Sequence, residues 1–266
     1  GGAIGLGTTA PTTTGAAILL ESGTVTTSGA GAHAVYANNA TGDITISEGA
    51  AGVITTTGAT ADGIEILNNG SGNTAVTTAG TITATGTGIN TINNSTAGNT
   101  TISQTAGTIT GGTNGINSLN DGTGSTNITV AGVVTGGTGV GINTSDSDTI
   151  SSTTDNFATV TLNSGAVVSS TSGVAIQNDE GDSLTTVNNG AAIQGKVILG
   201  DGNDNLVING TANISGATLL DGGDAANSVD LLGSTAYTNK LIFNGTTQSI
   251  AGSTMVDWQT VTLDNS

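Results

Sequence analysis

The amino-acid sequence predicts an all-β protein of the parallel β-helix class, and three observations indicate it. Two nearly identical phrases, AGTITATGTGINTINN at 79–94 and AGTITGGTNGINSLN at 106–120, are one period apart. Weaker copies occur at 51–69 and 131–145. A phrase that is repeated many times indicates architecture. Within the phrases apolar residues alternate with Thr or Ser, and this is the period of a strand. The 266 residues include 44 Gly and only 2% aromatic residues, and small β-branched side chains fit a narrow, layered core.

Each repeat of about 27 residues is expected to contain three short strands, so that each repeat is one coil. The first strand is expected at 43–47, 73–77, 99–103, 127–130, 158–162 and 184–187. The second is expected to be centred on Val25, Ile54, Ile82, Ile109, Val134, Val167 and Ile193. The third is expected to carry Val35, Ile64, Ile89, Ile116, Ile142 and Ile176. These apolar residues would stack inside coils that lie about 4.8 Å apart.

Two continuous regions are predicted. Residues 1–199 contain the repetitive coils, and residues 200–266 contain C-terminal coils with a cap or coupling segment. Larger apolar residues are concentrated in the second region, among them Phe243, Met255 and Trp258, and a repeat array needs a segment that covers its last coil.

Asparagine recurs after the third strand. The predicted structural ladder consists of Asn38, Asn68, Asn93, Asn120, Asn143 and Asn178. Asn tolerates the left-handed turn conformation, and stacked amides can form hydrogen bonds along the axis.

Charge excludes several classes of partner. The net charge is −17, there is no Arg, and Lys196 and Lys240 are the only lysines. Nucleic acids and anionic membrane surfaces would be repelled, whereas a basic surface or a divalent cation would be attracted. The absence of Cys excludes disulfides and thiolate metal sites. No apolar run is long enough for a membrane-spanning helix, so we expect no membrane insertion by this segment.

A turn at 200–206, GDGNDNL, resembles the calcium-binding RTX nonapeptide. Gly200, Gly202, Asp204 and Leu206 match that pattern and Leu199 does not. Asp201 and Asp204 are therefore candidate calcium ligands, and calcium is the only cofactor that the sequence suggests. The alternative is an acidic turn between two strands.

Acidic residues also cluster after the third strands. They are Asp121, Asp146, Asp148, Asp179, Glu180 and Asp182. On adjacent coils they could converge like the carboxylates of a polysaccharide hydrolase, and the alternative is a solvated charged turn. His33, the only histidine, has no obvious carboxylate partner in the sequence and is interpreted as a surface or turn residue.

Threonines flank the inward residue of the second strand and should point outward. This places Thr24, Thr26, Thr81, Thr83, Thr108 and Thr110 on one face, with Thr55 and Thr135 extending one column. Such a ladder looks like those of ice-binding proteins, although Val53 and Val133 interrupt the other column. The alternative is that Thr is simply a good outward-facing strand residue.

The C-terminal part resembles the end of the passenger domain of bacterial autotransporters (type V secretion). The resemblance rests on GDGNDNLVINGTANISGATLLDGG from Gly200 and on VDWQTVTL at 256–263, and the coils at 15–199 look like the degenerate Gly, Thr and Asn coils of such passengers. It implies a secreted, right-handed β-helix on a bacterial cell surface, often an adhesin.

The expected function is that of a non-enzymatic surface rod, either an adhesin or a structural, self-assembling protein. The expected partner is a protein or glycan of a host or neighbouring cell, or a second copy stacked end to end. The alternatives are a β-helical polysaccharide hydrolase and an ice-binding protein.

Overall fold

The computed structural model describes residues 4–6, 14–39, 41–94, 98–122, 124–145, 157–223, 239–245 and 254–264. These residues form 23 strands in one sheet, and neighbouring strands pair in parallel. None of the described residues forms a helix, so no helix in the described ranges is suited to crossing a membrane. The prediction of an all-β parallel β-helix is confirmed.

The strands are arranged as three faces that extend along the molecule. Face 1 consists of β6 (Thr74–Thr78), β9 (Thr100–Gln104), β12 (Thr126–Val130), β15 (Ala158–Leu162), β17 (Ser183–Val187), β19 (Asn205–Asn209), β21 (Lys240–Asn244) and β23 (Thr260–Asp264). Face 2 contains β7 (Thr81–Ala84), β10 (Thr108–Gly111) and β13 (Val133–Gly136). Face 3 consists of β1 (Ile4–Leu6), β3 (Val35–Asn39), β5 (Ile64–Asn68), β8 (Ile89–Asn93), β11 (Ile116–Asn120), β14 (Ile142–Ser145) and β22 (Thr254–Val256).

Five longer strands bend around a corner and belong to two faces. Strands β2 (Thr14–Thr27) and β4 (Thr41–Thr56) continue from face 1 to face 2. Strands β16 (Val167–Glu180), β18 (Ala192–Asp201) and β20 (Asn213–Asp221) continue from face 2 to face 3.

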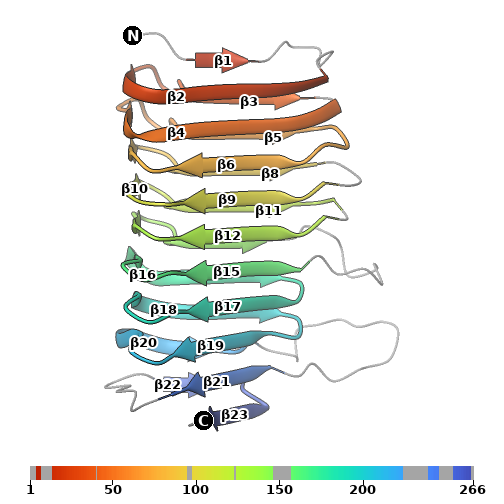
Figure 1. The fold of residues 1–266 in the computed structure, drawn as a ribbon, viewed down its shortest axis with the longest axis vertical. Coiled ribbons are helices and arrows are strands. Elements are labelled where there is room, and N and C mark those ends of the chain that lie inside the picture. Colours follow the sequence, from red (N-terminus) through yellow and green to blue (C-terminus); the bar gives the residue numbers. More distant parts are fainter. Residues whose placement is uncertain are drawn as a thin grey trace.

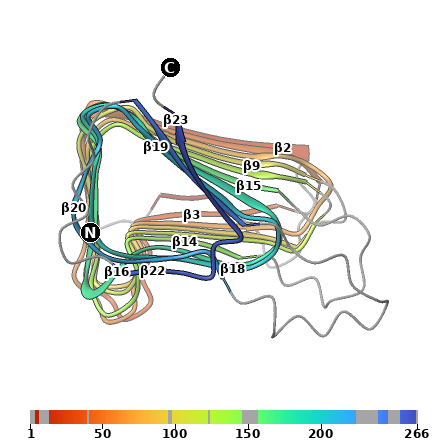
Figure 2. The same cartoon turned by 90° about the horizontal axis from the view of Figure 1, so that it is seen from below.

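The coils are right-handed. In Figure 1 the chain passes leftward through β6, β9 and β12 at the front, turns to the back at the left, and returns rightward while it descends. Figure 2 shows the coils end-on, with face 1 at the top, β20 at the left and face 3 at the bottom.

The core consists of columns of aliphatic side chains, one column from each face. The pairing stacks Ile46, Val76, Ile102 and Ile128 on face 1, Ile54, Ile82, Ile109, Val134 and Val168 on face 2, and Ile64, Ile89, Ile116, Ile142 and Ile176 on face 3. All of these side chains are at most 2% exposed. Alternation along each strand turns every second residue inward, so branched aliphatic residues fill most of the interior. Some inward positions are polar, among them Thr100 and Asn93, which are 0% exposed.

One predicted core residue is wrong by a single position. The residue in register with the buried Val134 is Val168, whereas Val167 pairs with Val133 on the outer surface. Because side chains alternate between the two surfaces of a sheet, an error of one residue exchanges inside and outside.

Candidate functional site

Face 2 carries two outward columns, which together we call the threonine face. The first column contains Thr24, Val53, Thr81, Thr108 and Val133, and the second contains Thr26, Thr55, Thr83, Thr110 and Thr135. The second column is therefore continuous over adjacent coils. Each threonine presents a hydroxyl and a methyl group at a spacing of about 4.8 Å. Such an array suits a flat or repeating partner better than a single small molecule.

Buried asparagines form a ladder at the corner between face 3 and face 1. The register places Asn39, Asn68, Asn93 and Asn120 in one column, each at most 1% exposed. Their Nδ2 atoms donate hydrogen bonds of 2.7 to 2.9 Å to the carbonyls of Gly42, Gly72, Gly98 and Gly124. Asn93 Nδ2 also donates to Asn120 Oδ1 at 2.9 Å. The amides therefore hold the turns that lead into face 1.

The structure places the predicted ladder residues in different positions. Asn68, Asn93 and Asn120 lie in the buried column. Asn38 does not, because it faces outward and is in register with Leu67, whereas Asn39 takes the buried place.

Two further predicted ladder residues also lie outside that column. Asn143 belongs to a second, outward ladder in which its Nδ2 donates to Asn117 Oδ1 (3.0 Å) and Asn117 donates to Asn90 (2.9 Å). Asn178 is in register with Thr144, yet its Nδ2 donates to the carbonyl of Gly181 at 2.9 Å, like the amides of the buried ladder.

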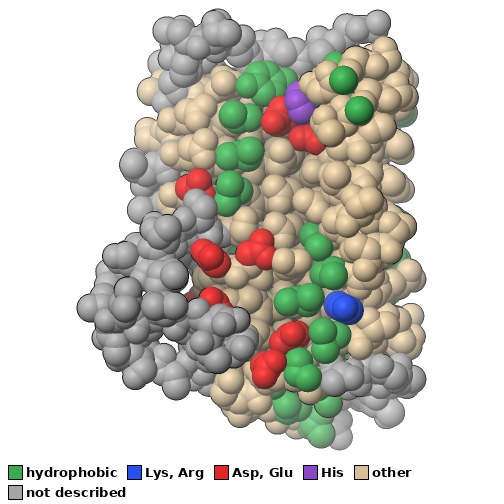
Figure 3. All heavy atoms as spheres, turned by 180° about the vertical axis from the view of Figure 1, so that it is seen from behind, with side chains coloured by type: hydrophobic (Ala, Val, Ile, Leu, Met, Phe, Trp, Pro, Cys, Tyr) green, Lys and Arg blue, Asp and Glu red, His purple; other side chains and the backbone are tan. Residues whose placement is uncertain are grey.

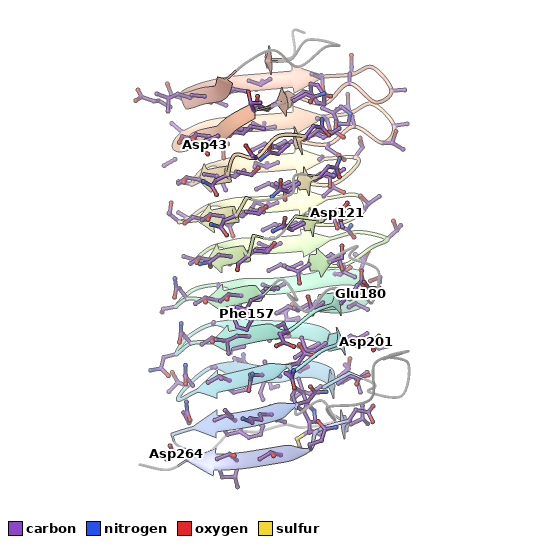
Figure 4. The ribbon with its side chains drawn as sticks, turned by 90° about the vertical axis from the view of Figure 1, so that its right-hand side faces the viewer. Asp43, Asp121, Phe157, Glu180, Asp201 and Asp264 are labelled. Atoms are coloured by element: carbon purple, nitrogen blue, oxygen red, sulfur yellow. The ribbon has the colours of Figure 1, made fainter. Side chains whose placement is uncertain are left out.

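Of the acidic residues predicted after the third strands, the structure describes Asp121, Asp179, Glu180 and Asp182. Figure 4 shows Asp121, Glu180 and Asp201 one below another. Asp179 and Glu180 are exposed, and Asp182 Oδ1 accepts hydrogen bonds from the backbone N–H of Asn203 (2.7 Å) and from its side chain (3.1 Å). Asp146 and Asp148 lie outside the described residues. None of the described members belongs to a group of three Asp, Glu or His side chains whose ligand atoms converge.

The candidate calcium turn contains one deeply buried carboxyl. Asp204 is 0% exposed; its Oδ1 accepts a hydrogen bond from Ser183 Oγ (2.5 Å), and its Oδ2 is buried with no hydrogen-bond partner. Burial raises the pKa of Asp204 to about 7, and the negative charges of Asp182 and Asp201 add to the effect. Asp201 is half-buried and in register with Glu180 on the preceding coil. Asp201 and Asp204 do not converge with a third carboxylate in the described part of the chain.

The interpretation of His33 as a residue without a carboxylate partner is wrong. Its Nε2 lies 2.9 Å from Glu65 Oε2, and its Nδ1 lies 3.8 Å from Asp62 Oδ2. Figure 3 shows the single histidine of the chain beside acidic side chains near the N-terminal end. These are the only three Asp, Glu or His side chains of the described residues whose ligand atoms all converge, lying within 4.8 Å of one another.

The turn between face 2 and face 3 positions His33 and Asp62, and the start of β5 positions Glu65. Val35 pairs with Ile64 and Tyr36 pairs with Glu65. His33 and Asp62 therefore occupy equivalent positions just before β3 and β5. The signal was therefore present in the sequence: an alignment of the first two coils places His33 opposite Asp62. The carboxylates are distant along the chain, since His33 and Glu65 belong to successive coils.

The tautomer of His33 follows from its hydrogen bonds. The Asp62 backbone N–H donates to His33 Nδ1 at 3.0 Å, so Nδ1 is an acceptor. The ring proton of the neutral imidazole is then on Nε2, which donates it to Glu65. Desolvation raises the pKa of Glu65, the positive charge of a protonated His33 opposes this, and the charge of Asp62 raises it further.

No protein-family model, curated protein or solved structure matches the chain.

Proposed function

We propose that the chain is a non-catalytic, secreted rod of a bacterial cell surface that binds its partner along an extended face. The observation that carries the proposal is the register of the threonine face, where similar side chains repeat from coil to coil. Repeat arrays of this kind present long binding surfaces rather than enclosed pockets.

Charge and sequence resemblance support the same proposal. The net charge of −17 keeps a rod soluble at high density and favours partners that are neutral or basic. The C-terminal phrases at 200–223 and 256–263, which resemble autotransporter passengers, favour a cell-surface location. We propose a protein or glycan of a neighbouring or host cell as the partner, with self-association of the rods as the other adhesive outcome.

The test measures adhesion of the purified chain. Beads coated with it are added to arrays of glycans and extracellular-matrix proteins, and bead clustering reports self-association. Binding that requires the threonine face should be reduced at least tenfold by Thr83→Lys and Thr110→Lys, because each inserts a long charged side chain into the array. The matched control is Thr101→Lys, which makes the same change at an exposed position on face 1. Absence of bead binding and clustering would rule out the adhesin and leave a spacer.

The two alternative functions have separate measurements. An ice-binding protein would give thermal hysteresis that Thr83→Lys abolishes, since the continuous threonine column is the surface that would contact ice. A hydrolase would release reducing ends from pectic or uronate polymers, and Asp121→Asn or Asp179→Asn would abolish this release. Either result would replace the proposed adhesive function.

A further inference from the structure

The cluster of His33, Asp62 and Glu65 has a chemistry that the proposed rod function does not use. It combines the only imidazole of the chain with two carboxylates from the next coil. We propose that it binds a divalent transition-metal ion of the zinc class. His33 Nε2 and the Glu65 carboxylate are the direct ligands, Asp62 supports the imidazole, and water completes the coordination.

Distances within the cluster fit this assignment. His33 Nε2 and Glu65 Oε2 are 2.9 Å apart. Two ligand atoms that bind zinc at about 2.0–2.1 Å in tetrahedral geometry lie only slightly farther from each other. The side chains of His33 and Glu65 are 22% and 16% exposed, so an ion can reach them from solvent.

Neighbouring groups hold the cluster in place before an ion arrives. Asp62 is 7% exposed, and its two carboxylate oxygens accept hydrogen bonds from the Thr87 backbone N–H (2.6 Å) and from Asn90 Nδ2 (3.0 Å). Tyr36 stacks on the His33 ring with centroids 6.2 Å apart. Metal sites depend on such supporting contacts, whose loss typically costs about 10- to 100-fold in affinity.

The electrostatics favour a cation at this place. The carboxylates of Asp62 and Glu65 lie close together and are largely removed from water, and His33 is the only basic side chain within the cluster. A divalent ion supplies that charge.

The ligand set also selects the metal. Imidazole nitrogen suits zinc, copper and nickel, whereas calcium and magnesium prefer sites built only from oxygen. A metal on Nε2 displaces the proton now shared with Glu65, and this proton moves to Nδ1. Asp62 Oδ2, 3.8 Å from Nδ1, is the carboxylate oxygen that can accept this proton, and the hydrogen bond from the Asp62 N–H to Nδ1 is then lost.

The test titrates the untagged chain with zinc chloride at neutral pH by calorimetry. We expect one site, with affinity reduced at least tenfold by His33→Gln and by Glu65→Gln. The matched control is Glu21→Gln, which removes an exposed carboxylate from β2 and should leave the affinity unchanged. Magnesium and calcium at the same concentration should not displace the zinc.

A second measurement needs no variant. Because His33 is the only histidine, its ring proton signals in the NMR spectrum are assigned without ambiguity. Zinc should shift these signals at one equivalent, and magnesium should not. Unchanged ring signals at saturating zinc, or equal zinc binding by folded His33→Gln and Glu65→Gln proteins, would overturn the proposal. Failure of the metal site would leave the rod function untouched, because adhesion by the threonine face is measured separately.

Discussion

Asp204 is a buried acid that makes the stability of the fold depend on pH. Its carboxyl is 0% exposed, and its pKa rises from 3.8 to about 7, chiefly through desolvation. The folded chain therefore retains a proton that the unfolded chain loses as the pH rises from about 4 to 7. The free energy of unfolding should fall over this interval and remain at the lower value above pH 7. The contribution of Asp204 to this fall is at most about 4 kcal/mol.

Replacing Asp204 by Asn should stabilise the protein at pH 8. The substitution removes a buried charge and keeps an acceptor for Ser183 Oγ, while its new amide donor offsets part of the gain. We expect an increase of about 2 kcal/mol at pH 8, little change at pH 5, and a smaller fall of Tm between these two pH values. Some fall should remain, because burial also raises the pKa of Glu48 and Glu65.

The control for this prediction is Glu21→Gln, which removes a charge from an exposed position and should leave the pH profile unchanged. Calcium provides a second comparison. If Asp204 were a calcium ligand, calcium would raise the Tm of the parent chain at pH 8 and chelation would lower it. A calcium effect that Asp204→Asn abolishes would support the predicted calcium site and contradict the interpretation of Asp204 as a buried acid without a bound ion.

At the scale of the elements, the turns that lead into face 1 depend on buried amides. Asn93 Nδ2 donates to the part-buried carbonyl of Gly98 and to Asn120 Oδ1, so Asn93→Ala removes both hydrogen bonds and leaves Asn120 Oδ1 with the Gly122 N–H. We expect a loss of about 1–3 kcal/mol, measured by thermal and urea unfolding. The neighbouring exposed Asn94, which bonds Asn69 Oδ1 at 3.1 Å, is the matched control, and Asn94→Ala should cost less than about 0.5 kcal/mol.

The register of face 2 can be tested with a second matched pair. Val168→Thr buries a hydroxyl in the core and should cost about 1–3 kcal/mol, whereas Val167→Thr places the same group on the outer surface and should be nearly neutral. The measurement is the Tm of each variant relative to the parent chain. Equal losses, or a larger loss for Val167→Thr, would contradict the pairing of Val134 with Val168.

The sequence predicts that the strands form the coils of a parallel β-helix, but it does not predict every inward-facing residue. The repeated sequence motifs and the period of two predict the coils, because each repeat encodes the same local structure. A period cannot say which of two adjacent similar residues faces inward, and Val167 with Val168 and Asn38 with Asn39 are such pairs. The cluster around His33 needed one more step, an alignment of successive coils that brings side chains about 30 positions apart into contact.

At the scale of the whole molecule, the strand pairs continue without interruption across residue 199. Pairing of β18 with β20 and of β19 with β21 links the repetitive coils to the C-terminal ones. The acidic side chains of successive coils are therefore held near one another, as Glu180 is beside Asp201. A net charge of −17 on such a stack produces repulsion that opposes folding.

Salt should therefore stabilise the rod. Raising sodium chloride from about 0.01 M to 0.5 M shortens the Debye length from about 30 Å to below 10 Å, which screens repulsion between charges on neighbouring coils. We expect Tm to rise by several degrees at pH 8, and choline chloride to have the same effect because screening depends on ionic strength rather than on the cation. The rise should shrink near pH 4, where the sequence pI of about 4.1 leaves little net charge to screen. A Tm that is independent of salt would mean that local contacts in the fold already offset the charge of each carboxylate. An effect that sodium chloride produces and choline chloride does not would indicate bound sodium ions instead of general screening.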